Sequence, residues 1–295
     1  HTFTEFAQRM KNDEMITLAK FLAISGIILP MLPHKNLIPD INLTPYSIWL
    51  ATVVVSGISY LSYLLKRYVF HESGTLVSGI IGGLYSSTAT ISVLARKSRK
   101  ASEQEATDYV AAMLLAVSMM FLRFMILILI FSREIFLSIY PYLLTMAVVA
   151  AIVAWFIHSR QKRPEGQSAE TEEDDSSNPL EFKVALIFAI LFVIFTFLTH
   201  YTLVYAGTGG LNLLSFVSGF SDITPFILNL LQNTGSVAAL IITACSMQAI
   251  ISNIMVNMFY ALFFAGKGSK LRPWILGGFG VVIVCNLVLL LFFYI

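Results

Sequence analysis

The sequence is short of charged residues. Only 12% of its 295 residues are charged and 57% are hydrophobic, whereas a soluble domain carries about 25% charged residues. Its two cysteines, Cys245 and Cys285, lie in apolar stretches, and no CxxC motif or Cys/His cluster occurs, which argues against a zinc site or thiol chemistry. The P-loop, GxSxG and HExxH motifs are lacking as well. We therefore expect an all-α integral membrane protein, not an enzyme, with no cofactor and no nucleic-acid partner.

Long apolar runs fill most of the chain. Each is close to the ~20 residues that a helix needs to cross a ~30 Å hydrocarbon core. They predict about seven transmembrane helices, at Ile16–Pro33, Ser47–Leu65, Tyr109–Phe131, Phe136–His158, Phe182–Tyr205, Ser236–Phe264 and Pro273–Ile295.

Two more apolar stretches, within residues 76–97 and 211–233, carry glycines and a polar cluster at their centres. If both crossed the membrane, Lys and Arg would be spread over both faces. If both enter and leave on one side, nearly all Lys and Arg share one face, and only Lys35 and Arg133 lie on the other. Cytoplasmic loops are rich in Lys and Arg. We therefore predict two re-entrant half-helices in a bacterial inner-membrane protein, with the N-terminus inside and the C-terminus outside.

The chain also reads as two copies of one unit. Gly219 and the residues after it match Gly83 and its followers 136 positions earlier, and Pro179 and Pro273 match Pro45 and Pro141 at similar offsets. With three spans in each copy, the second copy is inverted relative to the first. We expect residues 1–40 to hold a cytoplasmic segment and the first helix, 41–160 the first repeat, 161–178 an acidic cytoplasmic linker, and 179–295 the second repeat.

Polar residues inside these stretches are the candidates for function. Asp222 and Arg123 are the carboxylate and the cation that lie inside apolar stretches, where a charge is costly and often functional. The alternative is a structural ion pair between them. Thr88 and Thr224 occupy matched positions and predict the N-caps of two short helices whose N-termini face each other. Asn253 and Asn257 either line a pathway or bind neighbouring helices. The predicted ion pathway comprises Ser86, Ser87, Thr88, Thr90, Arg123, Ser221, Asp222, Thr224, Asn253 and Asn257.

The segments Gly82–Ala89, Leu94–Arg99, Asn178–Phe182 and Gly219–Asp222 resemble the C-terminal domain of unknown function of bacterial MgtC/SapB-type membrane proteins. The resemblance covers nearly the whole chain and implies an inner-membrane protein associated with magnesium homeostasis. The pattern of that domain has a second acid where this chain has Thr224, and a Lys where it has Asn257. These two differences remove one charge pair.

We therefore expect a channel or transporter for a small inorganic ion, with its pathway between the two re-entrant tips. The resemblance favours a cation, with Mg²⁺ as the example, and makes Asp222 the best candidate for a metal ligand. Two helix N-termini and Arg123 favour an anion instead. A regulatory membrane protein that binds another membrane complex, without transport, is the third alternative. We also expect a homodimer in the lipid bilayer.

Overall fold

The described part of the chain is almost entirely helical. The fold is known from a computed structural model that describes residues 12–39, 41–69, 74–99, 101, 103–160, 182–232, 237–266 and 269–294. Among these residues no strand occurs beyond one isolated bridge between Ile38 and Ile41. In chain order the helices are α2 (Asn12–Met31), α3 (Pro45–Leu64) with the π-helical turn η1 (Leu65–Val69), α4 (Thr75–Lys97), α5 (Glu103–Phe131), α6 (Arg133–Ser159), α7 (Phe182–Ser218), α8 (Ile223–Gln232), α9 (Ala239–Ala265) and α10 (Arg272–Tyr294).

Seven helices in the described part of the chain are long and apolar enough to cross a membrane, which makes this a multi-pass membrane protein. They are not quite the predicted seven. The apolar part of α2, Met15–Met31, is shorter than the other candidates, whereas α4 has the length of a span. The predicted linker, 161–178, lies outside the described residues.

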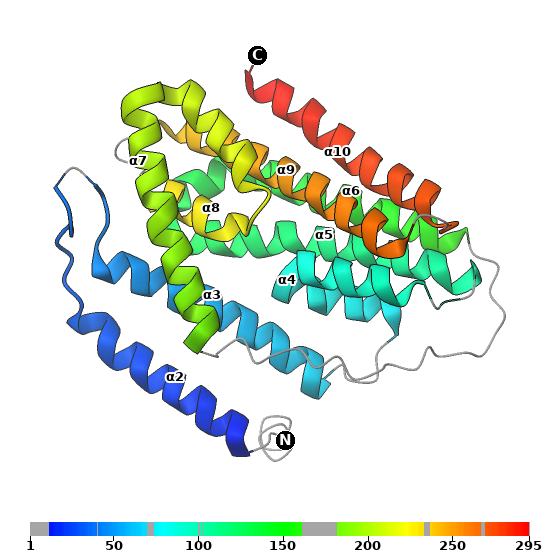
Figure 1. Cartoon of the computed structure of the whole chain (residues 1–295), viewed down its shortest axis with the longest axis horizontal. Helices are drawn as coiled ribbons and strands as arrows, with labels where there is room; N and C mark the ends of the chain where they lie inside the picture. Colours follow the sequence, from blue (N-terminus) through cyan, green and yellow to red (C-terminus); the bar gives the residue numbers. More distant parts are fainter. Residues whose placement is uncertain are drawn as a thin grey trace.

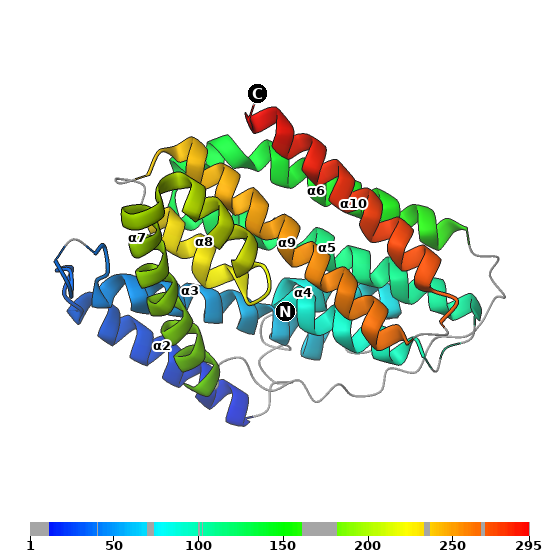
Figure 2. The same cartoon turned by 45° about the horizontal axis from the view of Figure 1, so that its top comes forward.

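Helices α5 and α9 form the centre of the molecule. They are the most buried of the candidate spans: 56% of the most apolar part of α5 and 72% of that of α9 is buried inside the molecule. Helices α6 and α10 flank them on one side, and α3 and α7 on the other (Figure 1). Helix α2 lies at the edge beside α3 in both views (Figure 2). The cavity described below is therefore bounded by the two most enclosed helices.

Helix α4 is broken in its middle. Ser86 has extended backbone angles, φ −160° and ψ 107°. A Cβ atom added to Gly82 would lie 2.5 Å from Oγ1 of Thr90, although eight residues of a continuous helix span about 12 Å. The two halves of α4 therefore fold back on each other at Ser86, and both of its ends lie at the same end of the molecule.

Helix α7 is broken in a similar way. Gly207 has φ 61° and ψ −152°, backbone angles that only glycine adopts without strain. A Cβ atom on Gly210 would lie 2.8 Å from Cγ2 of Thr202, which requires the chain to reverse direction at Gly207. The second half of α7 ends at Ser218, and α8 returns from there. Its last residue, Gln232, accepts a hydrogen bond of 2.6 Å from Nδ2 of Asn42, close to the start of α3.

Small residues let the hairpin of α4 approach α5 closely. Gly79 and Gly83 face Ala112 and Ala116, and a Cβ atom on Gly83 would lie 2.5 Å from the Ala116 Cα atom. This pairing of small residues four positions apart is typical of helix contacts in membranes. The turn after α7 makes an equivalent contact, because a Cβ atom on Gly219 would lie 2.3 Å from Cβ of Ser252 in α9.

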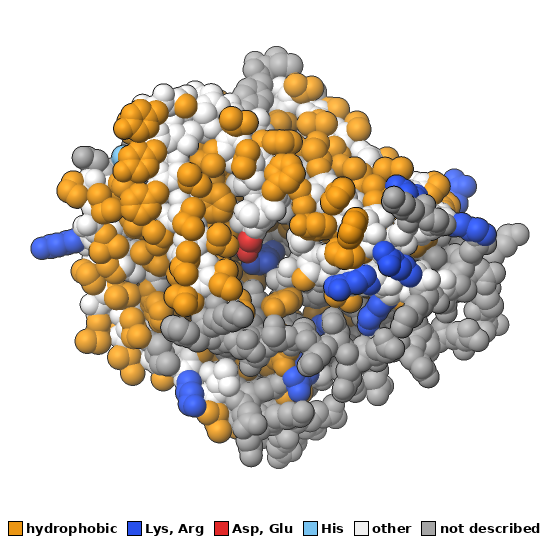
Figure 3. Space-filling model, viewed as in Figure 1, with side chains coloured by type: hydrophobic (Ala, Val, Ile, Leu, Met, Phe, Trp, Pro, Cys, Tyr) orange, Lys and Arg blue, Asp and Glu red, His pale blue; other side chains and the backbone are white. Residues whose placement is uncertain are grey.

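The described Lys and Arg residues gather mainly at one end of the molecule. Nε and Nη2 of Arg99, just after α4, donate to the carbonyls of Phe264 and Phe263 at the end of α9, the second at 3.2 Å. The guanidinium of Arg96 lies 5.1 Å from the Phe264 ring centroid. This end also holds Lys66, Arg67, Lys97, Arg160, Lys270 and Arg272. Most of the blue side chains in Figure 3 lie on this side, while hydrophobic side chains cover much of the remaining surface.

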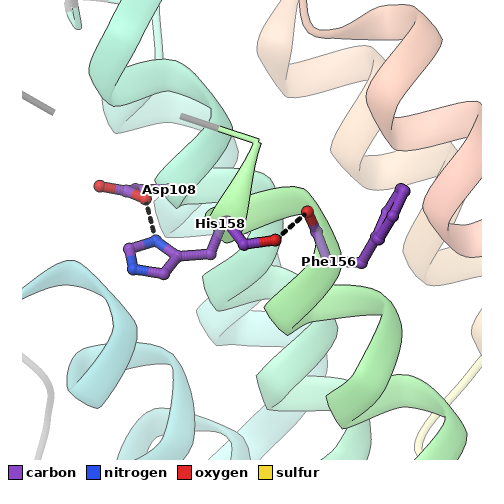
Figure 4. Close-up of polar contacts among 4 residues, drawn as sticks. Asp108, Phe156 and His158 are labelled. Atoms are coloured by element: carbon purple, nitrogen blue, oxygen red, sulfur yellow. Dashed lines mark hydrogen bonds and ion pairs between the residues drawn. The ribbon is translucent and has the colours of Figure 1, made fainter. Parts of the chain in front are cut away.

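A polar pair joins α5 and α6 at the same basic end. Nδ1 of His158, in the last turn of α6, lies 2.6 Å from Oδ1 of Asp108 near the start of α5 (Figure 4). Both side chains are partly exposed. Exposed pairs of this kind contribute little to the free energy of folding. We therefore interpret this one as a local contact between two helix ends.

The close contact of Gly83 with α5 gives a first prediction. The substitution Gly83→Ala should destabilise the fold by about 1–3 kcal/mol, the usual cost of overpacking a dense contact. The matched control is Gly277→Ala, because nothing lies within 4 Å of a Cβ atom added to Gly277. Heating both variants in detergent and measuring the monodisperse fraction by size exclusion checks this. Equal heat resistance of the two variants would contradict the packing described here.

Candidate functional site

The break of α4 at Ser86 and the turn between α7 and α8, at residues 219–222, meet at one cavity of about 460 Å³. These two are called the helix reversals below. One wall is the break of α4, and the facing wall is the turn between α7 and α8. Residues of α3, α5, the first half of α7 and α9 complete the lining. In Figure 3 a hollow near the centre of the face holds an acidic and a basic side chain, with hydrophobic side chains around it.

Eight of the ten residues predicted for the ion pathway line this cavity. They are Ser86, Ser87, Thr88, Arg123, Ser221, Asp222, Thr224 and Asn253. The other two do not line it. Thr90 packs against Gly82 inside the α4 hairpin. Asn257 lies one turn beyond Asn253 in α9 and is completely buried.

At the α4 break, polar side chains bind the backbone groups that the interruption frees. Nη1 of Arg123 in α5 donates to the carbonyl of Tyr85 at 2.9 Å, at the end of the first half-helix. The hydroxyl of Ser86 accepts from the backbone N–H of Ala89 at 3.4 Å, at the start of the second. Arg123 therefore holds the tip of the hairpin in place.

The turn before α8 has the same arrangement. Oδ1 of Asp222 accepts from the backbone N–H of Thr224 at 2.9 Å, which makes Asp222 the N-cap of α8. Asp222 stands 136 positions after Ser86, the residue that caps the second half of α4. The prediction that Thr88 and Thr224 are the N-caps is wrong, because each helix begins two residues earlier than the Thr-centred pattern indicates.

Helix α9 fastens the turn between α7 and α8. Nδ2 of Asn253 donates to the carbonyl of Gly219 at 3.2 Å, and Oγ of Ser252 donates to that of Phe216 at 2.6 Å. Nδ2 of Asn257 donates to Oδ1 of Asn253 at 3.1 Å. Asn257 thus orients Asn253, and both asparagines have a structural task, although Asn253 also faces the cavity.

Asp222 and Arg123 share the cavity without forming a contact ion pair. No ion pair within 4.0 Å joins them, so the structural pair considered from the sequence is not formed among the described residues. Asp222 is exposed. Nε of Arg123 is buried and has no hydrogen-bond partner among the described residues. The cavity therefore holds a cationic group whose hydrogen-bonding capacity is not used up.

Comparison with known proteins supports one family. Residues 53–265, from α3 to the end of α9, match the family described as "Domain of unknown function (DUF4010)". The chain belongs to the DUF4010 family. An uncharacterized protein of Aquifex aeolicus (strain VF5) is 25% identical over 227 residues, which cover 75% of this chain and 96% of that protein. No solved structure matches.

The DUF4010 match includes every residue that lines the cavity, among them several that the sequence analysis missed. Ser56 and Ser59 of α3, Tyr85, Phe220 and Tyr260 all line it. The available signal was a stripe on α3, where Thr52, Ser56, Ser59 and Tyr63 recur at intervals of three or four residues and share one face of the helix. Hydroxyl residues in apolar helices often donate to a backbone carbonyl of the same helix, as Thr52 does to Ile48 at 2.8 Å. Such a stripe alone therefore does not indicate a cavity.

No group of three or more His, Cys, Asp or Glu side chains that could hold a metal occurs in the described ranges. In the cavity, Asp222 is accompanied by hydroxyls, carbonyls and Asn253. Its role as a metal ligand stays a prediction.

Accessibility of the cavity can be tested with introduced cysteines. In a background with Cys245 and Cys285 replaced by alanine, we expect Ser221→Cys and Ser56→Cys to react with a small water-soluble thiol reagent. Ser118→Cys is the matched control, because Ser118 is 2% exposed, donates to the Ala147 carbonyl and does not line the cavity. Labelling is measured by mass shift in membranes. Protection of both cavity positions, with Ser118→Cys equally unreactive, would show that water does not enter.

Proposed function

We propose that this DUF4010 protein moves a small ion across the membrane through the cavity between the two helix reversals. One observation carries the proposal: polar groups from both reversals, with Arg123 and Asp222, line a single cavity among apolar helices. Interrupted helices at membrane depth are tolerated where they line a water-filled cavity or are buried in protein. Transporters place their binding sites at such interruptions.

The two reversals enter the fold from opposite ends, which supports the re-entrant model. Both ends of α4 lie at the basic end, because the helix folds back at Ser86. The far end of α8 is bound instead near the start of α3, through Asn42 and Gln232. Helix α3 runs from there towards the basic end, where Lys66 and Arg67 lie. A solute between the tips is then separated from each side by a different hairpin.

Matched contacts support an inverted repeat as well. Gly83 packs against Ala116, and Gly219 packs against Ser252. Both members of the second pair lie 136 positions after those of the first. The capping residues Ser86 and Asp222 differ by the same offset. We infer that the two hairpins descend from one unit and that alternating access of the two halves moves the ion.

The basic end is the one that we place in the cytoplasm, since Lys and Arg concentrate there. The bacterial inner membrane and the external C-terminus follow from this placement as proposals. A reporter fused after α10 should lie outside the cytoplasm. We therefore expect fused alkaline phosphatase, which works only there, to be active, and fused green fluorescent protein to be dark. The reverse pattern would overturn the orientation.

The resemblance to MgtC/SapB-type proteins favours a cation, and this association stays a hypothesis beside the DUF4010 membership. The cavity is lined by both a carboxylate, of Asp222, and a guanidinium, of Arg123. We therefore propose transport of an ion without assigning the sign of its charge. Absence of flux for every solute would favour the regulatory alternative. A homodimer stays a prediction.

Flux into liposomes that contain the purified protein tests the proposal. We expect selective flux, and we expect Asp222→Asn to change its rate or selectivity by about tenfold or more, a difference of ~1.4 kcal/mol. Asparagine caps helices about as well as aspartate, so this change removes the charge and keeps the N-cap. The matched control, Asp108→Asn, lies outside the cavity and should leave flux unchanged. Equal flux in both variants would eliminate the role of the Asp222 charge.

A further inference from the structure

The cavity is larger than a bare ion needs. Its volume of about 460 Å³ falls in the range of ~300–1,000 Å³ that is typical of sites for small organic molecules. We propose that it binds a small organic monocarboxylate, with the carboxylate towards Arg123 and the helix reversals and the hydrocarbon part against the apolar wall. Transport of this ligand rests on the proposed function, whereas its binding does not.

Arg123 supplies the first half of the argument. A guanidinium carries five N–H donors in a planar fork that matches a carboxylate. One donor, on Nη1, is used by the Tyr85 carbonyl. Nη2 makes no hydrogen bond in the part of the chain that the structure describes and, unlike Nε, is not among the enclosed atoms, so it is the donor that a ligand in the cavity can reach. A carboxylate satisfies such a donor with a charge-assisted hydrogen bond.

One helix N-terminus adds to the attraction for an anion. The second half of α4, residues 87–97, and α8, Ile223–Gln232, both begin at the cavity. Each N-terminus carries the positive end of a helix dipole. That of α8 is already capped by Asp222, and Pro225 in its first turn has no N–H, so the half-helix after Ser86 is the one that attracts an anion. The carbonyl ends of the opposing half-helices are already bound, by Arg123 at Tyr85 and by Asn253 at Gly219. These two carbonyls are therefore engaged and oppose an anion less than free carbonyls would.

Asp222 limits the charge of that ligand. One of its oxygens accepts the hydrogen bond from Thr224, but the carboxylate lines the same cavity as Arg123. A dianion would bring a second negative charge against it, and like charges at short range repel. A monoanion matches the single guanidinium.

The apolar wall supplies the hydrocarbon site. It consists of Val55 of α3, Met120 and Phe124 of α5, and Ile187, Phe188 and Leu191 of α7. A bare inorganic ion gains nothing from these side chains. A hydrocarbon chain does, and each methylene buried there should raise the affinity about fourfold.

The test is isothermal titration of the purified protein in lipid nanodiscs, with empty nanodiscs as the blank. The ligands are acetate, butyrate and hexanoate, with butyramide, butylammonium, chloride and Mg²⁺ as comparisons. We expect affinity to rise about fourfold per methylene along the carboxylates, and no binding of the neutral amide or the ammonium. Tighter binding of chloride, Mg²⁺ or butylammonium than of butyrate would overturn the proposal, as would heat from none of the ligands.

Variants locate the site. We expect Arg123→Gln to weaken butyrate binding at least about tenfold, as loss of a charge-assisted pair should. Arg133→Gln is the matched control, because Arg133 begins α6 away from the cavity. Because Arg123→Gln also frees the Tyr85 carbonyl, a second variant keeps the test valid if it fails to fold. Val256→Phe narrows the cavity from α9 and should weaken hexanoate more than acetate. Equal weakening of both, or none, would contradict the hydrocarbon site.

Counterflow of labelled butyrate in liposomes separates the two proposals. Binding without counterflow would overturn transport and keep the carboxylate site. Flux of an inorganic ion without carboxylate binding would keep ion transport and overturn the carboxylate site. Both together would support a carboxylate transporter.

Discussion

A helix that is interrupted within an apolar bundle frees backbone groups that water cannot reach, and these groups must be bound by side chains. The interruption at Ser86 and the turn after Ser218 meet this constraint in the same way. A polar side chain from the adjacent central helix binds a carbonyl at each tip. Arg123 of α5 binds that of Tyr85, and Asn253 of α9 binds that of Gly219. Most of the polar residues in α5 and α9 that face the tips are explained by this need. Both tips face the cavity.

The small residues follow from the same constraint. Side chains can hold the tips only if the hairpins lie very close to α5 and α9. Gly79 and Gly83 allow this on α5, and Gly219 allows it on α9 at Ser252. A larger residue at any of these positions would push the tip away from the donors that satisfy its carbonyls. Packing and hydrogen bonding at the tips are therefore coupled, and a change in one is expected to disturb the other.

The sequence predicts the helical membrane class and many of the polar residues that line the cavity, because glycine, hydroxyl residues and buried charges stand out in apolar stretches. It does not predict the apolar wall, because apolar side chains look alike along every span. Charge bias predicts re-entrant stretches at residues 76–97 and 211–233. The structure has a break at Ser86 and a turn at 219–222 within them, and their re-entry from one face of the membrane stays a prediction. The caps were misplaced at Thr88 and Thr224. Thr224 followed by Pro225 is a good local start for a helix, but the side chains of Ser86 and Asp222, two residues before each Thr, accept the capping hydrogen bonds instead. The tasks of Asn253 and Asn257 could not be separated without knowing which carbonyl lies beside each.

Counting charges does not give the electrostatic character of this cavity. One Asp and one Arg suggest neutrality, but their surroundings differ. The Asp222 carboxylate binds the N-terminus of α8, so part of its charge is balanced by that helix. The Arg123 guanidinium binds a single carbonyl and keeps an unpaired donor in a buried position. Had the two formed a contact pair, each would have neutralised the other and the cavity would attract no ion. Because Asp222 is engaged as a cap and forms no contact pair with Arg123, the guanidinium keeps donors that a ligand in the cavity could use.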